Sequence, residues 1–492
     1  MLVAALDQGS SSTKGALLDA RTGASVAAAS APVEIRREGE RAEHDPEAVL
    51  ASVRRVLDEL AAAGRPAALA LACQRSTCLL WERAGGRPLT AALSWQDTSA
   101  APRVRELAPL AAEVARRTGL RLTPYYAGPK LARLLDETPG ARERAAAGEV
   151  VAGTLDAFLA HRLAGRPTTE PGHAGRTLLY ELEGGGWDPW LCARFGVPEA
   201  ALPELLPSVA ARGSVAWRGE EGAVPLLAVA GDQQAALVGN AGEDGEAVVA
   251  HFGTGAFVLA GSGPAPRRHP GLLAAVAWSS AAARHFQLEG SVNSAGSAVD
   301  WAARLAGVAL GDLPDDPLDP ERLPLCLPGF VGVAAPWWVQ THGALLAGVR
   351  LEHDGLALLR GTLAGVAMRV ADCIESLVEA GLAPRVVRAS GRLATLAPLA
   401  QLLADATGLP VEVMAEQEAG LRGAARLAAL ALAAAGDADG GAAAAARLAD
   451  WAPVVRERRE PRWGSARRSA ARSRWRDFVA AATAVGPPPE AL

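Results

Sequence analysis

The chain has 492 residues, half of them hydrophobic, and a formal net charge of −5. This length favours at least two domains, and the composition can supply a large packed interior. The sequence has no basic stripe of the kind that nucleic acids or anionic membrane surfaces attract, so we expect neither as a partner.

Five cysteines are scattered along the chain without metal-ligand spacing. An odd number of unclustered cysteines is typical of reduced thiols in a cytoplasmic protein. The N-terminus MLVAALDQGS lacks a basic region, which is unlike a signal peptide. No apolar run is long enough to span a bilayer. We therefore expect a cytoplasmic protein.

The first elements predict a β-hairpin. The apolar run LVAAL ends at Asp7, the polar turn QGSSSTK follows, and GALLDA resumes as a second strand. The next segment predicts a helix with Asp45 as N-cap and Pro46 at its first position. Residues 100–230 are predicted to be mainly helical, and strands return at PLLAVA and AVVAHF.

The stretch from residue 231 to 255 carries the clearest chemistry. Asp232 follows the run PLLAVA, and Gly253-Thr254-Gly255 closes the run AVVAHF. A carboxylate at a strand end is a candidate general base, and a Gly-Thr-Gly turn lets backbone N–H groups approach a phosphate. Together they predict phosphoryl transfer to a hydroxyl. Ordinary turn roles for both segments remain the alternative.

A weak internal repeat organises the chain. A strand–turn–strand unit with Asp7 opens the first half, and a second unit with the Gly-Thr-Gly turn opens the other half. Two α/β halves of this kind imply a cleft between them. We place the boundary in NAGEDGE, giving domains 1–242 and 243–455, followed by an Arg-rich, helical tail over 456–492 that we expect to be peripheral.

Many short motifs occur in one collinear order between residues 2 and 430, among them LDQGSSSTKGALLD, EHDPEAVL, CQRSTCLLW, TGLRLTPYYAGPKL, TTEPGHAGRTLLYEL, AGDQQAALVGN, FGTGAFVL, EGSVNSAGSAVDW and ASGRLATLAPLAQLLADATG. In these motifs the chain resembles the FGGY family of carbohydrate kinases, most closely its glycerol-kinase branch. The resemblance implies a duplicated α/β, two-lobed actin-like ATPase (ribonuclease H-like) fold with an interlobe cleft. It also implies ATP and Mg²⁺ as cofactors and transfer of the γ-phosphoryl group to a small polyol or sugar.

The resemblance also implies roles for individual residues. Asp232 matches the catalytic base, and Asp7 matches the carboxylate that holds Mg²⁺ through water. The acceptor substrate, in domain 1–242, would contact Arg75, Trp95, Tyr125, Asp232 and Gln233. The nucleotide, mainly in domain 243–455, would contact Ser10, Ser11, Lys14, Thr254, Gly255, Gly296, Asp300 and Gly391. The alternatives are core packing for the two aromatic residues and helix packing for Gly296.

Two departures from the family pattern concern specificity. Glycerol kinases carry Glu after the pocket Arg, whereas Ser76 follows Arg75 here. A missing hydroxyl partner can change specificity strongly, so the change leaves room for a longer polyol. The second departure is Arg392, which follows Gly391 where a second Gly is usual. It would either stack on the adenine base or obstruct it.

Other functions remain open at this stage. A ketopentose (xylulose or ribulose) kinase is the nearest alternative, although Gln74-Arg75-Ser76-Thr77 differs from the Gln-x-His-Gly motif of xylulose kinases. A catalytically degenerate nucleotide- or sugar-binding regulator is another, favoured by Arg392 and Asp300. A homodimer is the default assembly that we expect.

Overall fold

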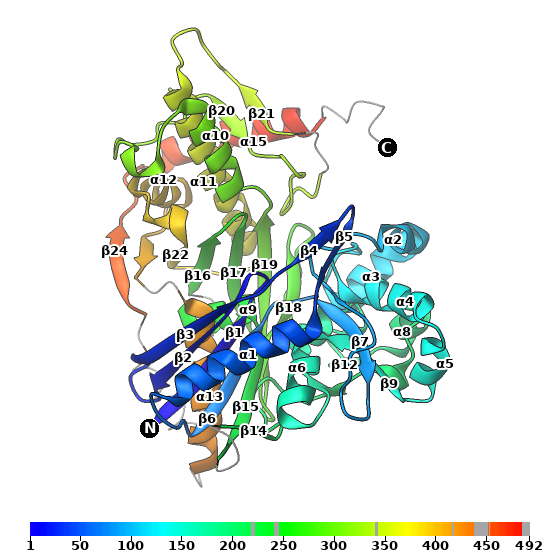
Figure 1. Cartoon of the computed structure of the whole chain (residues 1–492). Helices are drawn as coiled ribbons and strands as arrows, with labels where there is room; N and C mark the ends of the chain where they lie inside the picture. The colour runs from blue at the N-terminus through cyan, green and yellow to red at the C-terminus, as the bar shows by residue number, and fades with distance from the viewer. Residues whose placement is uncertain are drawn as a thin grey trace.

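The computed structural model describes residues 1–217, 222–240, 246–339, 343–415, 418–436, 451 and 453–484. These residues form two α/β lobes, with the N-terminal lobe below the C-terminal lobe in Figure 1. The boundary expected between residues 242 and 243 lies outside the described residues, as does the Ala-rich stretch 437–450.

The N-terminal lobe is built on a six-stranded sheet with the order β14-β15-β6-β1-β2-β3. Its strands are β1 (Leu2–Gln8), β2 (Ser12–Asp19), β3 (Ser25–Pro32), β6 (Ala68–Cys73), β14 (Ser214–Ala216) and β15 (Ala223–Gly231). The predicted hairpin is confirmed, because β1 pairs with β2 antiparallel and brings Asp7 opposite Lys14. β1 and β15 both pair with β6 in parallel, so β1 and β15 end at the same edge of the sheet, with Asp7 and Asp232 there.

Helix α1 (Pro46–Ala61) packs on this sheet. It begins where predicted, since the Asp45 side chain accepts a hydrogen bond from the backbone N–H of Glu47. Its buried face carries residues such as Val49, Val53 and Val56 at helical spacing, which contribute to the core of the lobe.

A second part of the N-terminal lobe holds a five-stranded sheet with the order β4-β5-β8-β7-β9. These strands are β4 (Arg36–Glu38), β5 (Arg41–His44), β7 (Cys78–Glu82), β8 (Ala92–Leu93) and β9 (Val150–Thr154). The predicted helices surround it as α2 (Ala101–Leu107), α3 (Ala111–Thr118), α4 (Ala127–Glu137), α5 (Ala141–Ala146), α6 (Leu155–Ala164), α7 (Pro171–Gly175) and α8 (Pro189–Phe195). Two short pairs complete this part, β10 (Thr168–Thr169) with β13 (Glu204–Leu205) and β11 (Tyr180–Glu181) with β12 (Gly186–Trp187).

The C-terminal lobe repeats this plan in a seven-stranded sheet with the order β18-β19-β17-β16-β22-β23-β24. Its strands are β16 (Ala247–Phe252), β17 (Ala256–Gly263), β18 (Leu273–Ser279), β19 (Arg284–Val292), β22 (Val386–Ser390), β23 (Val411–Met414) and β24 (Val455–Arg459). Helices α10 (Gly296–Ala306), α11 (Gly355–Glu379) and α12 (Ala397–Thr407) belong to this lobe, as does the pair β20 (Leu325–Leu327) with β21 (Leu345–Ala347). The hairpin β16–β17 followed by parallel β22 matches β1–β2 followed by parallel β6, which confirms the predicted internal repeat.

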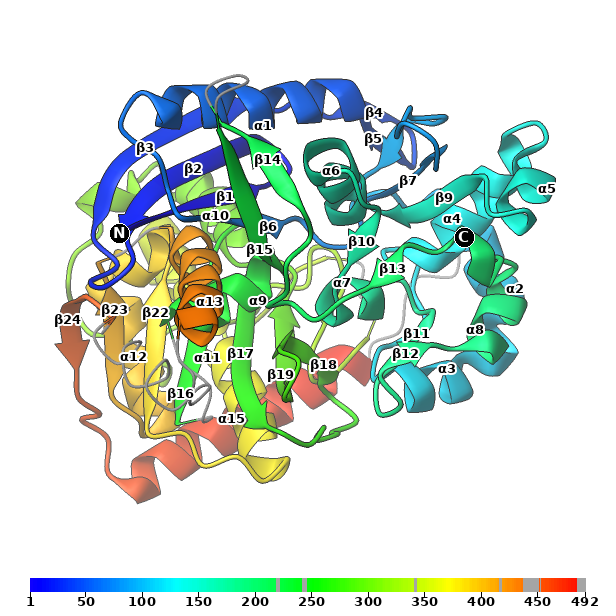
Figure 2. The ribbon, with the colours of Figure 1, turned by 90° about the horizontal axis from the view of Figure 1, so that it is seen from below.

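Two helices join the lobes by close contact. Helix α9 (Asp232–Asn240) starts at the end of β15, and α13 (Ala419–Gly436) packs against α9 and against β1, β6 and β15 (Figure 2). Glycine makes this approach possible. A Cβ on Gly423 would lie 1.7 Å from the Ala235 carbonyl oxygen, and one on Gly239 would lie 2.3 Å from the Ala419 carbonyl oxygen. Helix α13, which comes from the second half of the sequence, therefore packs behind the sheet edge of the N-terminal lobe that carries Asp7 and Asp232.

The C-terminal tail departs from the peripheral helix that the sequence predicted. β24 pairs with β23, and α15 (Ser465–Ala484) buries Trp475 and Val479 in the core of the C-terminal lobe. The Arg472 side chain is also buried, where it pairs with Asp372. The predicted tail helix is confirmed as α15, and most of its residues are exposed as expected. The tail is nevertheless not peripheral, because its few apolar residues share one buried face and two carboxylates of α11 bind Arg472.

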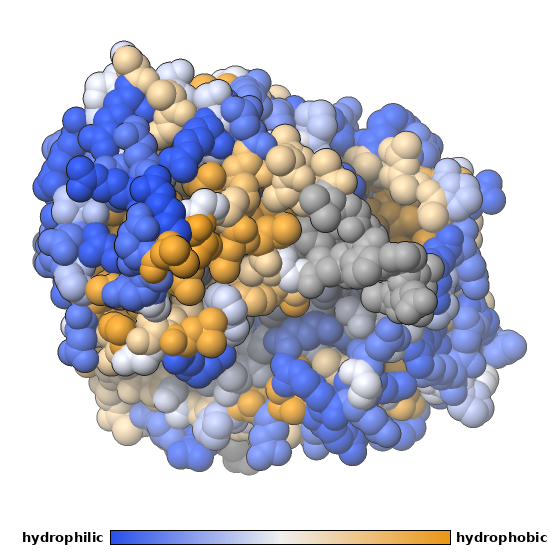
Figure 3. Space-filling view, turned by 90° about the horizontal axis from the view of Figure 1, so that it is seen from above, coloured by the Kyte–Doolittle hydropathy of each residue, from blue (hydrophilic) through white to orange (hydrophobic). Residues whose placement is uncertain are grey.

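Apolar side chains are exposed on one part of the C-terminal lobe. Four of the large exposed apolar residues fall in one segment, namely Val331, Leu346, Val349 and Leu351. Figure 3 shows apolar surface gathered on the side of the molecule seen from above. Among the helices of the described part of the chain, none is long and apolar enough to cross a membrane.

Candidate active site

Asp7 lies at the end of β1 among other charged groups. Burial raises the pKa of the Asp7 carboxyl to about 7, with help from the carboxylates of Asp232 and Glu418, while Lys14 opposes the rise. A Cβ on Gly420 would lie 2.6 Å from Asp7 Oδ2, so the start of α13 comes close to this carboxylate. Three acidic groups from β1, α9 and the segment before α13 are thus assembled at one place.

Asp232 is the first residue of α9 and keeps about a third of its side chain accessible, at 30%. Its Oδ1 accepts a hydrogen bond from the backbone N–H of Gln233 at 2.8 Å and lies 3.4 Å from Arg75 Nε. The preceding glycine allows this contact, because a Cβ on Gly231 would lie 2.9 Å from Arg75 Cδ. The structure therefore brings together three residues of the predicted acceptor site.

Arg75 also forms a buried ion pair that sequence reasoning missed. Its Nη1 lies 2.7 Å from Glu289 Oε2 on β19, and Arg176 donates a hydrogen bond to the same oxygen. Burial alone would raise the pKa of Glu289, but Arg176 and Arg75 outweigh it and lower the pKa to about 2. Both Glu289 and Arg176 occur in motifs that carry the family resemblance, and only the fold shows that they meet.

Trp95 and Tyr125 are not core residues, since they are 39% and 49% exposed. The core-packing alternative for these two aromatic residues is therefore wrong. The indole N–H of Trp95 donates a hydrogen bond to Ser10 Oγ at 2.9 Å, which joins a predicted acceptor residue to a predicted nucleotide residue. Ser10 Oγ lies in turn 3.3 Å from Gln74 Oε1. Ser11 is exposed in the same turn between β1 and β2.

Lys14, on β2, has its charge already engaged. Its Nζ lies 2.6 Å from Glu418 Oε1, and both side chains are partly exposed. Sequence reasoning missed Glu418, for which no motif was singled out. A phosphate that binds Lys14 would share it with this carboxylate.

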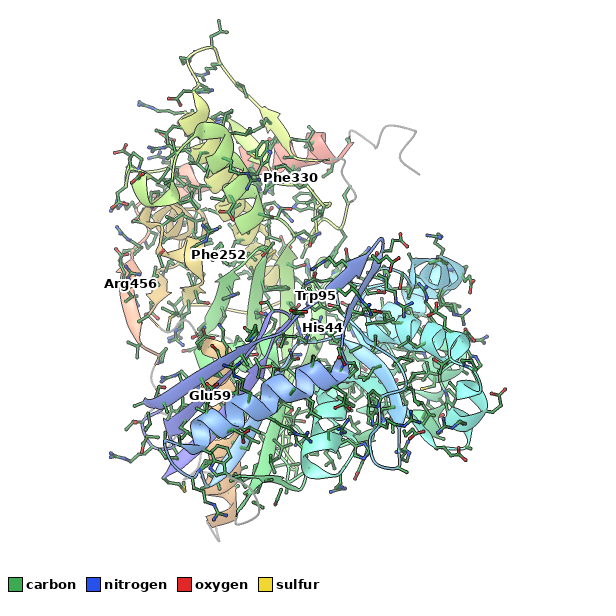
Figure 4. All side chains as sticks on the ribbon, in the orientation of Figure 1. His44, Glu59, Trp95, Phe252, Phe330 and Arg456 are labelled. Atoms are coloured by element: carbon green, nitrogen blue, oxygen red, sulfur yellow. The ribbon has the colours of Figure 1, made fainter. Side chains whose placement is uncertain are left out.

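The predicted nucleotide residues of the C-terminal lobe meet through their backbones. The N–H of Gly296 donates to the Gly253 carbonyl at 3.1 Å, and the Thr254 carbonyl accepts from the N–H of Ala295 at 3.0 Å. Close approach requires glycine at three positions. A Cβ would lie 2.7 Å from the Val292 carbonyl oxygen at Gly255, 2.4 Å from the Gly253 carbonyl oxygen at Gly296, and 2.2 Å from the Phe252 carbonyl oxygen at Gly391. In Figure 4, the labelled Phe252, which directly precedes Gly253, shows where these backbone contacts lie in the upper lobe, and the labelled Trp95 lies in the lower lobe.

The two unusual residues of this region form an ion pair with each other. Arg392 Nη2 lies 2.6 Å from Asp300 Oδ1, and the two side chains are 59% and 44% exposed. Arg392 begins the short turn after Gly391, and Asp300 lies in the first turns of α10 after Gly296. The ion pair therefore links the segment that follows Gly391 to the start of α10 at Gly296.

The residues around Asp7 fit a divalent cation. Burial and two neighbouring carboxylates, Asp232 and Glu418, raise the pKa of Asp7, and a cation would offset the repulsion among the three acidic groups. No cluster of three or more His, Cys, Asp or Glu side chains with metal-ligand geometry occurs in the part of the chain that the structure describes. A single carboxylate with waters and phosphate oxygens is the usual arrangement for Mg²⁺ beside a nucleotide.

Family models match almost all of this architecture. The N-terminal domain of the FGGY family of carbohydrate kinases matches residues 2–239, and its C-terminal domain matches residues 248–432. The chain belongs to the FGGY family of carbohydrate kinases. The enzyme is accordingly an ATP-dependent kinase of small sugars or polyols, as the sequence motifs implied.

Curated relatives agree with this assignment. A glycerol kinase of Alkalilimnicola ehrlichii is 36% identical over 447 residues, covering 87% of this chain and 90% of the relative. One from Cereibacter sphaeroides is 33% identical over 505 residues, covering 98% and 99%. The main prediction of a kinase of the glycerol-kinase type is thus confirmed at the level of the family.

Solved structures confirm the two-lobed actin-like fold. Plasmodium falciparum glycerol kinase with ADP superposes with a TM-score of 0.87 at 23% identity, covering 99% of both chains. Ligand-bound xylulose kinase from Lactobacillus acidophilus superposes with a TM-score of 0.85 at 20% identity, covering 98% of this chain and 99% of the other.

Proposed function

We propose that this FGGY kinase transfers the γ-phosphoryl group of ATP to a hydroxyl of a small polyol, with Asp232 as the catalytic base. The observation that carries the proposal is the position of Arg75. It lies 3.4 Å from Asp232 Oδ1 and 2.7 Å from Glu289 on β19, the strand that pairs with β17 just after the Gly-Thr-Gly turn. This link between the lobes supports one site that contains both the candidate base and the candidate phosphate turn.

In the proposed reaction the acceptor hydroxyl lies between Asp232 and the phosphate turn. Its proton passes to the Asp232 carboxylate as its oxygen forms the new bond to the γ-phosphorus. The bond from the γ-phosphorus to the bridging oxygen breaks, and ADP keeps that electron pair. Arg75, fixed by Glu289, would hold the Asp232 carboxylate in place. Mg²⁺ held by Asp7 through water would supply neutralisation of phosphate charge.

The acceptor site would be lined by Arg75, Trp95, Tyr125 and Gln233. Gln233 Oε1 is a buried oxygen without a hydrogen-bond partner among the described residues, and a substrate hydroxyl would satisfy it. Ser76 adopts a left-handed backbone conformation with φ of 65°, and it replaces the larger acid that the family resemblance leads one to expect. The loss of that carboxylate weakens the case for glycerol itself and leaves room for a longer acceptor such as a four-carbon polyol.

The test is an ADP-release assay over glycerol, erythritol, other tetritols, pentitols and the ketopentoses xylulose and ribulose. We expect turnover with glycerol or a tetritol and little with ketopentoses. Faster turnover of a ketopentose would show that the acceptor is xylulose or ribulose rather than a polyol. Clear ATP binding without turnover of any of these compounds would instead support a regulatory protein.

An Asp232→Asn variant tests the base. We expect kcat to fall about 10²–10⁴-fold, the usual contribution of a positioned acid–base group. Retention of near-full kcat would remove Asp232 from this role. A cytoplasmic location and a homodimeric assembly belong to the same proposal, and cell fractionation and light scattering test them.

A further inference from the structure

His251 is a titratable residue beside the phosphate turn that the proposed reaction leaves without a role. It lies near the end of β16, and its side chain is partly buried. Its Nδ1 forms a hydrogen bond with Ser390 Oγ on the neighbouring strand β22 at 3.0 Å. A Cβ on Gly253 would lie 3.8 Å from His251 Nε2. The ring therefore lies against Gly253, with Nδ1 directed to β22 and Nε2 directed to the turn.

The second ring nitrogen is available to an external partner. His251 Nε2 has no hydrogen-bond partner among the residues that the structure describes, and it is not one of the fully buried polar atoms that lack one. Burial lowers the pKa of His251, so the ring is neutral at pH 7. When the Ser390 hydroxyl donates to Nδ1, the ring proton must be on Nε2. The ring then presents one N–H donor to the site.

The charged groups around the His251 ring are mainly carboxylates, which would repel a phosphoryl group, so an N–H donor on the ring would help to bind one. Asp232 from α9 and Glu418 from the segment before α13 are negative, and Lys14 from β2 is positive but paired with Glu418. Arg388, on β22, donates to the Asn240 carbonyl and pairs with Glu412. A phosphoryl group that enters here meets carboxylates, so it depends on N–H donors from its other side.

We propose that His251 Nε2–H donates a hydrogen bond to a phosphoryl oxygen of the nucleotide, and that Ser390 is a positioning residue that fixes the ring tautomer. The inference rests on the proposed function, because it takes the phosphate chain to lie at Gly253-Thr254-Gly255. His251 thereby extends the phosphate site beyond the backbone N–H groups of the turn.

Calorimetric titration at pH 7.5 with a non-hydrolysable ATP analogue, and separately with adenosine, tests the contact. In His251→Leu we expect the affinity for the analogue to fall about 10- to 100-fold, as for a hydrogen bond to a charged group, and the affinity for adenosine to stay within about twofold. His251→Gln places an amide N–H near the position of Nε2 and should recover most of the affinity. His269→Leu, at a partly buried histidine paired with Glu379, is the matched control.

Equal loss for adenosine and for the analogue would show a structural role and overturn the proposal, as would unchanged binding by a folded His251→Leu. Absence of analogue binding by the wild-type protein would also overturn it. These titrations need no acceptor substrate, so they test the His251–phosphoryl contact separately from the proposed kinase function. If analogue binding depends on His251 but no polyol or sugar is turned over, the kinase function is refuted and the contact stands.

A Ser390→Ala variant tests the positioning role. At pH 7.5 the ring would divide between two tautomers, and we expect KM for ATP to rise about two- to fivefold. As the pH falls through the lowered pKa of His251, the ring becomes protonated and donates from both nitrogens, so the difference from wild type should shrink. A defect that stays constant with pH would mean that Ser390 acts by packing and would overturn the tautomer assignment.

Discussion

Arg75 and Glu289 form a buried ion pair across the two halves of the chain, with 2.7 Å between Nη1 and Oε2. Arg75 follows β6 in the N-terminal lobe, and Glu289 lies on β19 in the C-terminal lobe. The same arginine contacts Asp232, so the proposed base is held from the other lobe through a single side chain.

Glu289→Gln should weaken the fold, because the buried Arg176 would lose its anion and Arg75 would keep only the longer contact with Asp232. We expect a loss of about 3–5 kcal/mol in the free energy of unfolding, measured by urea denaturation, and a higher KM for the acceptor. Glu183→Gln, at an exposed partner of Arg268, is the control and should change stability by less than about 1 kcal/mol. Equal stability of the two variants would contradict this account of the ion pair.

Asp7 should make the stability of the metal-free protein fall as the pH rises. The pKa of Asp7 is about 7 in the fold, against 3.8 for an aspartate free in water, so the folded state binds more protons between these values. Stability is then lost from about pH 4 to pH 7. Asp7→Asn should flatten this slope in thermal melts without metal, while activity is lost. Added Mg²⁺ at pH 8 should raise Tm in wild type only. A similar Mg²⁺ effect in both proteins would place the cation elsewhere.

Gly423→Ala should separate α9 from α13. The added methyl group would lie 1.7 Å from the Ala235 carbonyl oxygen, which is a backbone atom and cannot turn away. We expect Tm to fall by at least about 5 °C, because overpacking at a helix contact costs roughly 1–3 kcal/mol or more. Gly311→Ala, where no atom lies within 4 Å of the new methyl group, should melt within about 1 °C of wild type. Matching melting curves for both variants would be inconsistent with this packing.

Arg392→Ala should affect nucleotide use and leave stability unchanged. The Arg392–Asp300 pair is exposed, and such pairs contribute little to folding. A guanidinium beside the proposed nucleotide site can stack on an adenine ring, so we expect KM for ATP to rise about two- to fivefold with kcat unchanged. Asp300→Ala frees the same guanidinium and serves as the comparison. A lower KM in Arg392→Ala would show that the arginine obstructs the base.

Local sequence signals predicted much of the fold. The hairpin around Asp7, the N-cap at Asp45 and the hairpin whose turn contains Thr254 depend on neighbouring residues, and all three are present. The tail was predicted less well. Its many arginines indicate a solvated helix, and only the packing against α11 shows that Trp475 and Arg472 are buried.

The sequence by itself determined the family, the α/β repeat and the residue types that phosphoryl transfer requires, because these depend on order and spacing along the chain. Only the tertiary structure decided which of those residues meet. Glu289 lies 214 positions from Arg75, and Glu418 lies 404 positions from Lys14. Such ion pairs leave no local pattern in the sequence, since their strength depends on distance and burial in the folded chain.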